Sequence, residues 1–190
     1  MMPQSLLDKI KTSILDLLFP AFCLGCKKEE LFLCASCRLS LQAQPPSCFY
    51  CHKLSWPVGR TCESCREHTK VYAFLSPFSY GDNVVKELIH NLKYNRIRSL
   101  AEILADLLED YLQKYKIWLP KEALLIPIPL HKGRERKRGF NQARLIAQHL
   151  SAGLNLELAE KVLKKTKATK PQIELRAEER RKNLTGAFTV

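Results

Sequence analysis

The chain has 190 residues, of which 46% are hydrophobic, and this size and composition fit one ordinary domain together with a small one. The net charge is +12, and most of the excess follows residue 129, where fifteen basic residues stand against six acidic ones. Such a concentration indicates a phosphate-bearing partner, either nucleic acid or a polyphosphate metabolite. A solvated basic surface that aids solubility accounts for it equally well.

The N-terminal stretch from Leu6 to Phe19 is apolar, but four charged residues interrupt it. It has neither the unbroken apolar core nor the cleavage site of a signal peptide, and it is too short and too charged to span a bilayer. Its leucines and isoleucines recur at helical spacing, which predicts an amphipathic helix within residues 1–20 that packs on the protein's own core. Binding to a membrane surface is the alternative. We therefore expect a cytoplasmic protein without a transmembrane segment, whose thiols stay reduced.

All eight cysteines lie between positions 23 and 65 and form four pairs with two residues between the thiols. The pairs are Cys23/Cys26, Cys34/Cys37, Cys48/Cys51 and Cys62/Cys65. This spacing lets one tight turn aim both sulfurs at one metal ion, and two pairs complete the closed tetrahedral shell of a structural zinc site. We predict two structural zinc ions in a double zinc ribbon over residues 21–68, whose folding free energy comes from metal binding.

The assignment of pairs to metal ions has two solutions. A Pro-Pro step at positions 45 and 46 separates the halves and favours consecutive pairing, while interleaved pairing would give a cross-braced module. A disulfide framework would need an oxidising compartment, and a redox site would not need four pairs. Gly25 is expected to supply an unusual backbone angle in the first turn.

Three aromatic residues accompany the second half of the cysteine region. They are Phe49, Tyr50 and Trp56. We expect them to cover a small metal core, and stacking on nucleic-acid bases is the alternative.

Helical and extended patterns alternate from residue 71 onward. Residues 71–80 are rich in aromatic and β-favouring types, which predicts extended structure. Asp82 is expected to cap a first helix. Ser99 and Glu102 are expected to form a capping box on a second helix. Both helices carry an apolar stripe and are expected to pack in the core.

The next segment carries the pattern strand, loop, helix. Leu124 to Ile126 predicts a short buried parallel strand. A loop with five basic residues is expected from His131 to Gln142, followed by a helix that runs to about Gly153. Ligands of α/β folds bind at the carboxyl ends of strands, where this loop lies. Residues 164–170 are expected to be mobile, and residues 186–190 to begin a strand, so the domain is expected to be incomplete.

Four groups of residues together resemble the ComF family, predicted phosphoribosyltransferase-like proteins associated with DNA uptake in bacterial competence. They are Leu-Leu-Phe-Pro20 before the cysteines, Leu-Ile-His-Asn-Leu-Lys-Tyr94, Pro-Ile-Pro-Leu-His131 with Arg-Gly-Phe-Asn-Gln142, and Thr-Lys-Pro-Gln172 with Arg-Arg-Lys-Asn-Leu184 and Gly-Ala-Phe188. The resemblance implies an α/β fold: an incomplete phosphoribosyltransferase-like parallel sheet over residues 71–190, preceded by the double zinc ribbon.

The family's donor-binding motif has no counterpart in these 190 residues. It consists of an acidic pair followed by a Thr/Gly-rich loop, and the chain has neither an Asp-Asp pair nor a Thr-Thr-Gly sequence. The resemblance therefore implies a transferase-like domain that is inactive and lacks its C-terminal part. If the native chain extends past Val190, it implies an enzyme that uses magnesium and phosphoribosyl diphosphate (PRPP).

The resemblance and the basic loops also nominate residues that bind phosphate or nucleic acid. They are Arg134, Arg136, Arg138, Asn141, Gln142, Lys170, Gln172 and Arg180. The first group would lie near the pyrophosphate of a donor, and the last three belong to a loop that closes over the site. The alternatives are a solvated loop for residues 134–138 and a helix N-cap for Asn141.

The function expected from these features is that of a ComF-like accessory protein in DNA uptake. It would bind single-stranded DNA through the zinc ribbon and the basic loops, and would have a protein partner in the competence machinery. The alternatives are a PRPP-using transferase and a zinc-ribbon module for protein interaction.

Overall fold

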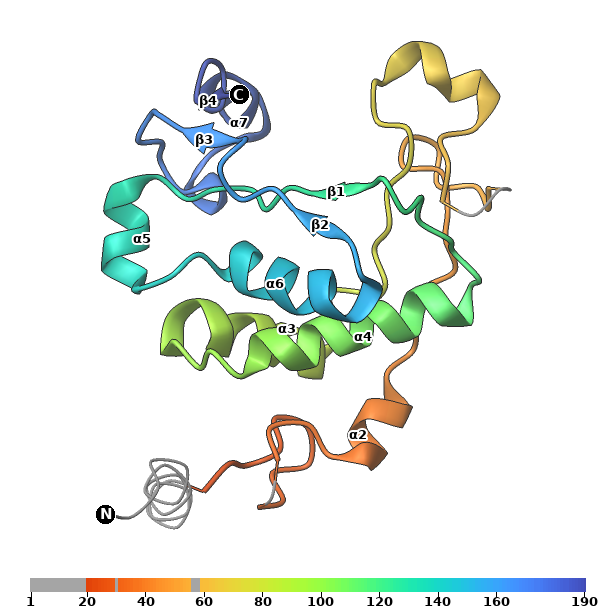
Figure 1. Cartoon of the computed structure of the whole chain (residues 1–190), viewed down its shortest axis with the longest axis vertical. Coiled ribbons are helices and arrows are strands. Elements are labelled where there is room, and N and C mark those ends of the chain that lie inside the picture. The colour runs from red at the N-terminus through yellow and green to blue at the C-terminus, as the bar shows by residue number, and fades with distance from the viewer. Residues whose placement is uncertain (1–19, 30, 56–58) are drawn as a thin grey trace.

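The computed structural model describes residues 20–29, 31–55 and 59–190, so the helix expected within residues 1–20 and Trp56 lie outside the described residues (Figure 1). The helices are α2 (Ala35–Ser40), η1 (Glu63–His68), α3 (Asn83–His90), η2 (Asn91–Asn95), α4 (Leu100–Lys114), α5 (Lys132–Arg138), α6 (Gln142–Leu154), η3 (Gln172–Glu174) and α7 (Ala177–Asn183). The strands are β1 (Leu124–Leu125), β2 (Glu157–Leu158), β3 (Lys164–Lys165) and β4 (Phe188–Thr189).

The helices α3, α4 and α6 form the layer that contains the core. Leu88, Leu92, Leu100 and Leu107 are buried there together with Phe140. Helices α4 and α6 lie along each other in Figure 1. Apolar residues at spacings of three and four place one face of each helix inward, as the sequence predicts.

The two predicted helix starts have different outcomes. Asp82 caps α3 as predicted, because its carboxylate accepts hydrogen bonds from the backbone N–H groups of Val84 and Val85 at 2.8 and 3.1 Å. The capping box of Ser99 and Glu102 is wrong. Ser99 already has helical backbone angles and makes no side-chain cap, because the turn at residues 97–99 leads directly into α4.

The chain leaves α3 through a π-helical turn, η2. The buried Asn91 donates to the Glu87 carbonyl at 2.9 Å and accepts from the Asn95 amide at 2.8 Å. Arg96 then ends the turn in a left-handed conformation, with a φ of 60°. Such turns recur at functional sites, and this one carries Lys93, Tyr94 and Arg96 to one end of the helical layer.

Strand β1 is parallel as predicted, but it is not buried. It pairs with β2 in the register Leu124 to Glu157 and Leu125 to Leu158. Leu124 is 50% exposed and Ile126 is 43% exposed. Within the described parts of the chain β1 has β2 as its sole partner strand, so its other edge is not paired with a strand. The architecture is thus a mixture of helices and small two-stranded sheets.

The segment predicted as a basic loop contains a helix. In α5, Gly133 donates its N–H to Nδ1 of His131 at 3.3 Å, and Gly139 ends the helix with a φ of 89°. The expectation of a loop was wrong because it weighed charge alone, although Arg, Lys and Glu are good helix formers and both ends are capped.

The C-terminal residues form a small antiparallel sheet rather than an open tail. Lys164 and Lys165, from the segment expected to be mobile, pair as β3 with Thr189 and Phe188 of β4. The strand start expected at residues 186–190 is therefore confirmed. Residues 71–80 are a connector with one isolated bridge, Arg60 to Ala73, and carry no named strand.

Candidate metal centres and a basic cavity

The eight thiols gather into two groups of four that can hold metal ions. The groups are Cys23, Cys26, Cys34, Cys37 and Cys48, Cys51, Cys62, Cys65, and in each the sulfurs lie within 4.8 Å of one another. Consecutive pairing is therefore confirmed. The sulfurs of Cys26 and Cys34 are 3.7 Å apart, as are those of Cys51 and Cys62. A tetrahedral zinc–sulfur shell with bonds of about 2.3 Å has sulfurs about 3.8 Å apart, so the donor set fits zinc.

The two groups are built by the same local structure. The residue after the second cysteine, Lys27 or His52, is left-handed and donates its N–H to the carbonyl of the first cysteine at 2.9 Å. The third cysteine then precedes a short helix, α2 or η1. Its N–H donates to the first thiol at 3.4 Å in both groups. The ribbons are thus a structural repeat that the cysteine spacing alone did not reveal.

Hydrogen bonds from backbone N–H groups lower the pKa of one thiol in each group and so favour its thiolate form. Burial raises the pKa of the Cys23 thiol, but hydrogen bonds from backbone N–H groups outweigh it and bring the pKa to about 6. In the second group, hydrogen bonds from the backbone N–H groups of Cys51, Cys62 and Tyr50 lower the pKa of Cys48 to about 6. Hydrogen bonds to the neighbouring Cys34 and Cys62 sulfurs raise the pKa values of Cys37 and Cys65 to about 12. A bound cation would let all four thiols ionise.

Gly25 has a different role from the one predicted. It is absent from the residues with a positive φ, so it supplies no unusual backbone angle. A Cβ there would lie 2.7 Å from the Cys37 sulfur and 3.2 Å from a methyl group of Val84. The glycine is therefore needed for the close approach of the first thiol group to α3.

The first ribbon packs against the buried cluster, whereas the second lies on the other side of the helical layer and projects from it (Figure 1). Leu33 belongs to the buried cluster, and Cys37 packs against it. Arg38 of α2 donates to the Asp110 carboxylate of α4 at 2.6 and 3.0 Å and lies 3.7 Å from Asp106. The second ribbon is joined to α4 through the segments on either side of it.

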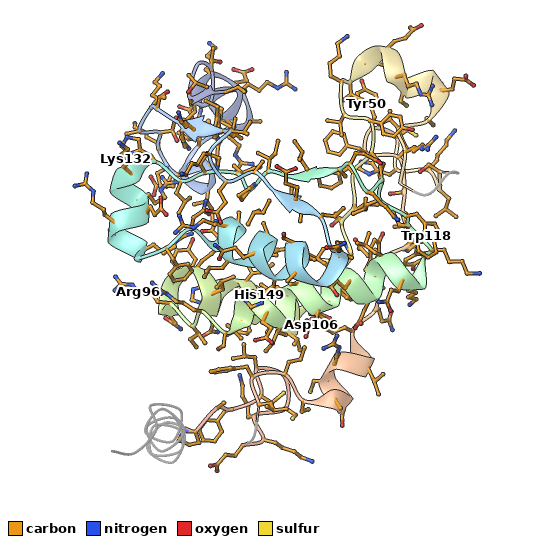
Figure 2. The ribbon with its side chains drawn as sticks, in the orientation of Figure 1. Tyr50, Arg96, Asp106, Trp118, Lys132 and His149 are labelled. Carbon is orange, nitrogen blue, oxygen red and sulfur yellow. The ribbon has the colours of Figure 1, made fainter. Side chains whose placement is uncertain are left out.

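A cavity of about 320 Å³ opens between η2, α5 and residue 171. Its lining consists of Lys93, Tyr94, Arg96, Arg134, Lys137, Arg138 and Pro171. Five of these seven residues are cationic and none is acidic. Figure 2 shows that Arg96 and Lys132 of α5 lie at one end of the helical layer, with Trp118 at the other.

Neutral groups of the protein hold these cations in place. Arg96 donates to the Lys137 carbonyl at 2.8 Å, and Arg134 donates to the Thr169 carbonyl at 3.1 Å. Arg138 donates to the Gln142 amide oxygen and lies over the Tyr94 ring. In the described part of the chain no cation of the cavity forms an ion pair with a carboxylate.

The cations of the cavity act on one another. Burial lowers the pKa of Lys93, and the positive charge of Arg138 lowers it further. Burial also lowers the pKa of Arg138; Tyr94 partly offsets this, and Arg134 adds to it. An anion in the cavity would relieve this repulsion, so the arrangement is suited to bind a phosphate group.

The structure brings together some of the nominated residues. Arg134 and Arg138 line the cavity, Gln142 contacts Arg138, and Lys170 and Gln172 flank Pro171. Both polar atoms of the Gln172 side chain are buried without a hydrogen-bond partner among the described residues. Arg136 lies exposed on α5 and is absent from the cavity lining.

Two nominated residues make contacts that stabilise the fold. Asn141 is 5% exposed; its oxygen accepts from the Ala143 N–H and its amide donates to the Ile128 carbonyl, both at 3.0 Å. It is therefore the N-cap of α6, the alternative stated above. Arg180 donates from Nε to the carbonyls of Gln172 and Leu175 at 2.9 and 3.0 Å.

Sequence reasoning missed five residues of the cavity lining, namely Lys93, Tyr94, Arg96, Lys137 and Pro171. Lys93 and Tyr94 stand in the Leu-Ile-His-Asn-Leu-Lys-Tyr sequence that carried part of the resemblance, which was the available signal. Their helix was interpreted only as a core element.

The fold and sites define a protein with two four-cysteine groups that can hold metal ions and with a cavity lined by basic residues, and proteins with competence names are similar to it. Competence protein F of Haemophilus influenzae is 28% identical over 162 residues, covering 83% of this chain and 69% of that protein. DNA utilization protein YhgH of Escherichia coli K12 is 27% identical over 158 residues, covering 82% and 70%. Competence protein ComFC of Bacillus subtilis is 34% identical over 131 residues, covering 65% and 53%.

These similarities extend over most of the chain and support its resemblance to the ComF family. No protein-family model matches it, and no solved structure matches it. No helix among the described residues is long and apolar enough to cross a membrane.

Proposed function

We propose that this protein is an accessory factor in DNA uptake that binds single-stranded nucleic acid through the phosphates of the strand. Support for the process comes from the names of its relatives, which refer to competence and DNA utilization. The observation that carries the binding is the cavity lined by five cations and no carboxylate. It acts on strands in the cytoplasm, with a protein of the uptake machinery as partner.

The cavity suits phosphate because its cations are unpaired and held in position. Fixed guanidinium groups bind phosphate oxygens in a bidentate way and lose little freedom on binding. Arg96 and Arg134 are anchored to carbonyls, and Lys93 and Lys137 add two further positive charges. The outward cations of α5, among them Arg136, extend the positive surface for neighbouring phosphates.

Two zinc ions serve the fold in this proposal. The cysteine groups of both ribbons would hold them, and the metal would supply the folding free energy that such small segments lack. The first ion would tie α2 to the core, and the second would form the projecting ribbon. The closed four-sulfur shells leave no open position for catalysis.

Salt dependence of binding tests this proposal. Anisotropy of a labelled single-stranded oligonucleotide is measured between 50 and 200 mM KCl, where each phosphate contact contributes a slope of about −0.7. Lys93→Ala and Lys137→Ala are each expected to weaken binding to every sequence and to make the slope shallower by about 0.7. Neither side chain makes a hydrogen bond in the described structure, so folding should persist.

Lys121→Ala is the matched control. Lys121 is an exposed lysine three residues after Trp118, and Trp118 lies at the opposite end of the helical layer (Figure 2). The Lys121→Ala variant should bind the oligonucleotide like the unmodified protein. Equal slopes for Lys93→Ala, Lys137→Ala and Lys121→Ala would exclude the cavity as the phosphate site, and an affinity independent of salt would exclude binding through phosphates.

A PRPP-using transferase is the second candidate, favoured by the compact size of the cavity and its position beside the start of α6. The present chain has neither the acidic pair nor the Thr-Thr-Gly loop of a donor site, and we propose that it has no transferase activity. Calorimetric titration with PRPP and magnesium decides between the accessory factor and the transferase. Saturable, magnesium-dependent binding of PRPP would contradict the proposal that the chain has no transferase activity.

A further inference from the structure

A second cavity, of about 280 Å³, lies where the second ribbon meets α4. Phe49 and Phe74 line it with their rings, whose centroids are 4.9 Å apart and whose planes are inclined by 47°. Phe49 and Phe74 are 42% and 49% exposed as whole residues. Sites for drug-sized ligands have volumes of about 300–1,000 Å³. The volume of this cavity is just below that range and suits a single planar ring system.

The α4 side of this cavity carries an unpaired hydroxyl group. Tyr111 is 2% exposed, lines the cavity, and its hydroxyl is buried without a hydrogen-bond partner in the parts of the chain that the structure describes. Burial, with a smaller contribution from Tyr115, raises its pKa to about 12, so the group remains an O–H donor. A buried donor without an acceptor is rare in native proteins and calls for a ligand or an ordered solvent molecule.

The neighbouring tyrosine on the same helix shows the contrast. Tyr115 contacts the Tyr111 ring, with centroids 4.9 Å apart, and its hydroxyl donates to the Ala43 carbonyl at 3.3 Å. One of the two hydroxyls therefore has an acceptor within the protein, while that of Tyr111, a residue of the cavity wall, has none among the described residues.

The rim of the cavity adds polar groups. Gln44, Ser47 and His52 belong to the lining and offer both donors and acceptors. A purely apolar ligand would leave Tyr111 unpaired, and an inorganic anion would lie against two aromatic rings. A nucleobase satisfies both features, because it has a face that stacks on Phe and an edge that accepts hydrogen bonds.

We propose that this cavity binds one unstacked nucleobase of a single strand, with the Phe49 ring stacking on its face, Phe74 packing against the Phe49 ring, and Tyr111 donating to the edge of the base. The inference rests on the proposed function, because the strand is the source of the base. Arg60, on the same ribbon, lies over the exposed Tyr72 ring at 5.0 Å and supplies a cation for an adjacent phosphate.

The test compares two conservative variants on α4 with two kinds of strand. The probes are a labelled oligothymidylate and an abasic deoxyribose-phosphate strand of the same length. Tyr111→Phe is expected to weaken oligothymidylate binding by roughly three- to tenfold without changing abasic binding, since it removes one hydrogen bond to a base. Tyr115→Phe, the control, should bind both probes like the unmodified protein.

A stability measurement separates this role from a structural one. The Tyr111 hydroxyl makes no bond within the described structure, so Tyr111→Phe should not lower the melting temperature. Tyr115→Phe should lower it slightly, because it loses the bond to Ala43. Phe49→Ala is expected to weaken oligothymidylate binding by about tenfold or more.

The failures of the two proposals are distinguishable. If oligothymidylate and the abasic strand bind equally well, and Tyr111→Phe and Phe49→Ala change neither, phosphate binding stands and the base site is wrong. If neither strand binds, the proposed function itself fails. If thymidine monophosphate saturates the cavity while the strands do not bind, the site is for free nucleotides and the inference is overturned.

Discussion

The substitution Gly25→Ala tests whether the first thiol group is fixed against the helical layer. The added Cβ would lie 2.7 Å from the Cys37 sulfur and 3.2 Å from Val84 on α3, below normal contact distances. Overpacking of this kind costs about 1–3 kcal/mol. Because the φ of Gly25 is not positive, the alanine also stiffens the unfolded chain, which offsets about 0.4–1 kcal/mol.

We therefore expect a net loss of about 1–2 kcal/mol, which lowers the melting temperature by roughly 2–8 °C in a chain of this size. The assay is thermal unfolding followed by circular dichroism, together with zinc release to a chromogenic chelator. Gly133→Ala in α5 is the control with the opposite sign. Its Cβ would meet His131 at an ordinary 3.5 Å, and alanine in a helix is worth about 0.5–1 kcal/mol over glycine. Equal melting and equal zinc retention for Gly25→Ala and the unmodified protein would refute the close-approach argument.

Other changes have expected outcomes that follow from the same contacts. Cys37→Ser should lower the stability of the whole chain, because this thiol packs on the core, whereas Cys62→Ser should leave the cooperative melting of the helical layer intact. Thermal unfolding of both variants is followed by circular dichroism. An equal loss of stability in Cys37→Ser and Cys62→Ser would contradict the different roles of the two ribbons. Asn141→Ala should cost about 2–3 kcal/mol in urea unfolding, since it removes the cap of α6 and the partner of the Ile128 carbonyl. A loss under about 0.5 kcal/mol would show that water replaces both bonds.

The local periodicity of the sequence was enough to predict the principal helices. Asp82 and Asn141 cap helices because short polar side chains reach the free N–H groups of a first turn, whatever the rest of the fold does. The capping box at Ser99 failed because tertiary packing leads the chain into α4 through a helical turn. Leu124 was predicted to be buried, but apolar character cannot report how many neighbouring strands a sheet will provide.

The sequence was enough to predict the two candidate metal centres, but it predicted the basic cavity only in part. Cysteine spacing carries the tetrahedral geometry of a metal shell within a few residues, so both thiol groups followed from it. The cavity instead joins Lys93 and Arg96 to Arg134, which are about forty residues apart in the chain, through the π-helical turn η2. The cluster of basic residues in the sequence identified the α5 side of the cavity, but it did not identify the η2 side.

By itself the sequence determined the thiol groups, the Asp82 cap and the basic character of residues 130–190, because each depends on residues within one or two turns of one another. Tertiary structure alone decided that the first ribbon joins the core while the second projects, and that Tyr111, whose buried hydroxyl is unpaired among the described residues, lines one cavity with Phe49 and Phe74. Cavities form between elements that are distant in the chain, and their depth and lining depend on how those elements pack.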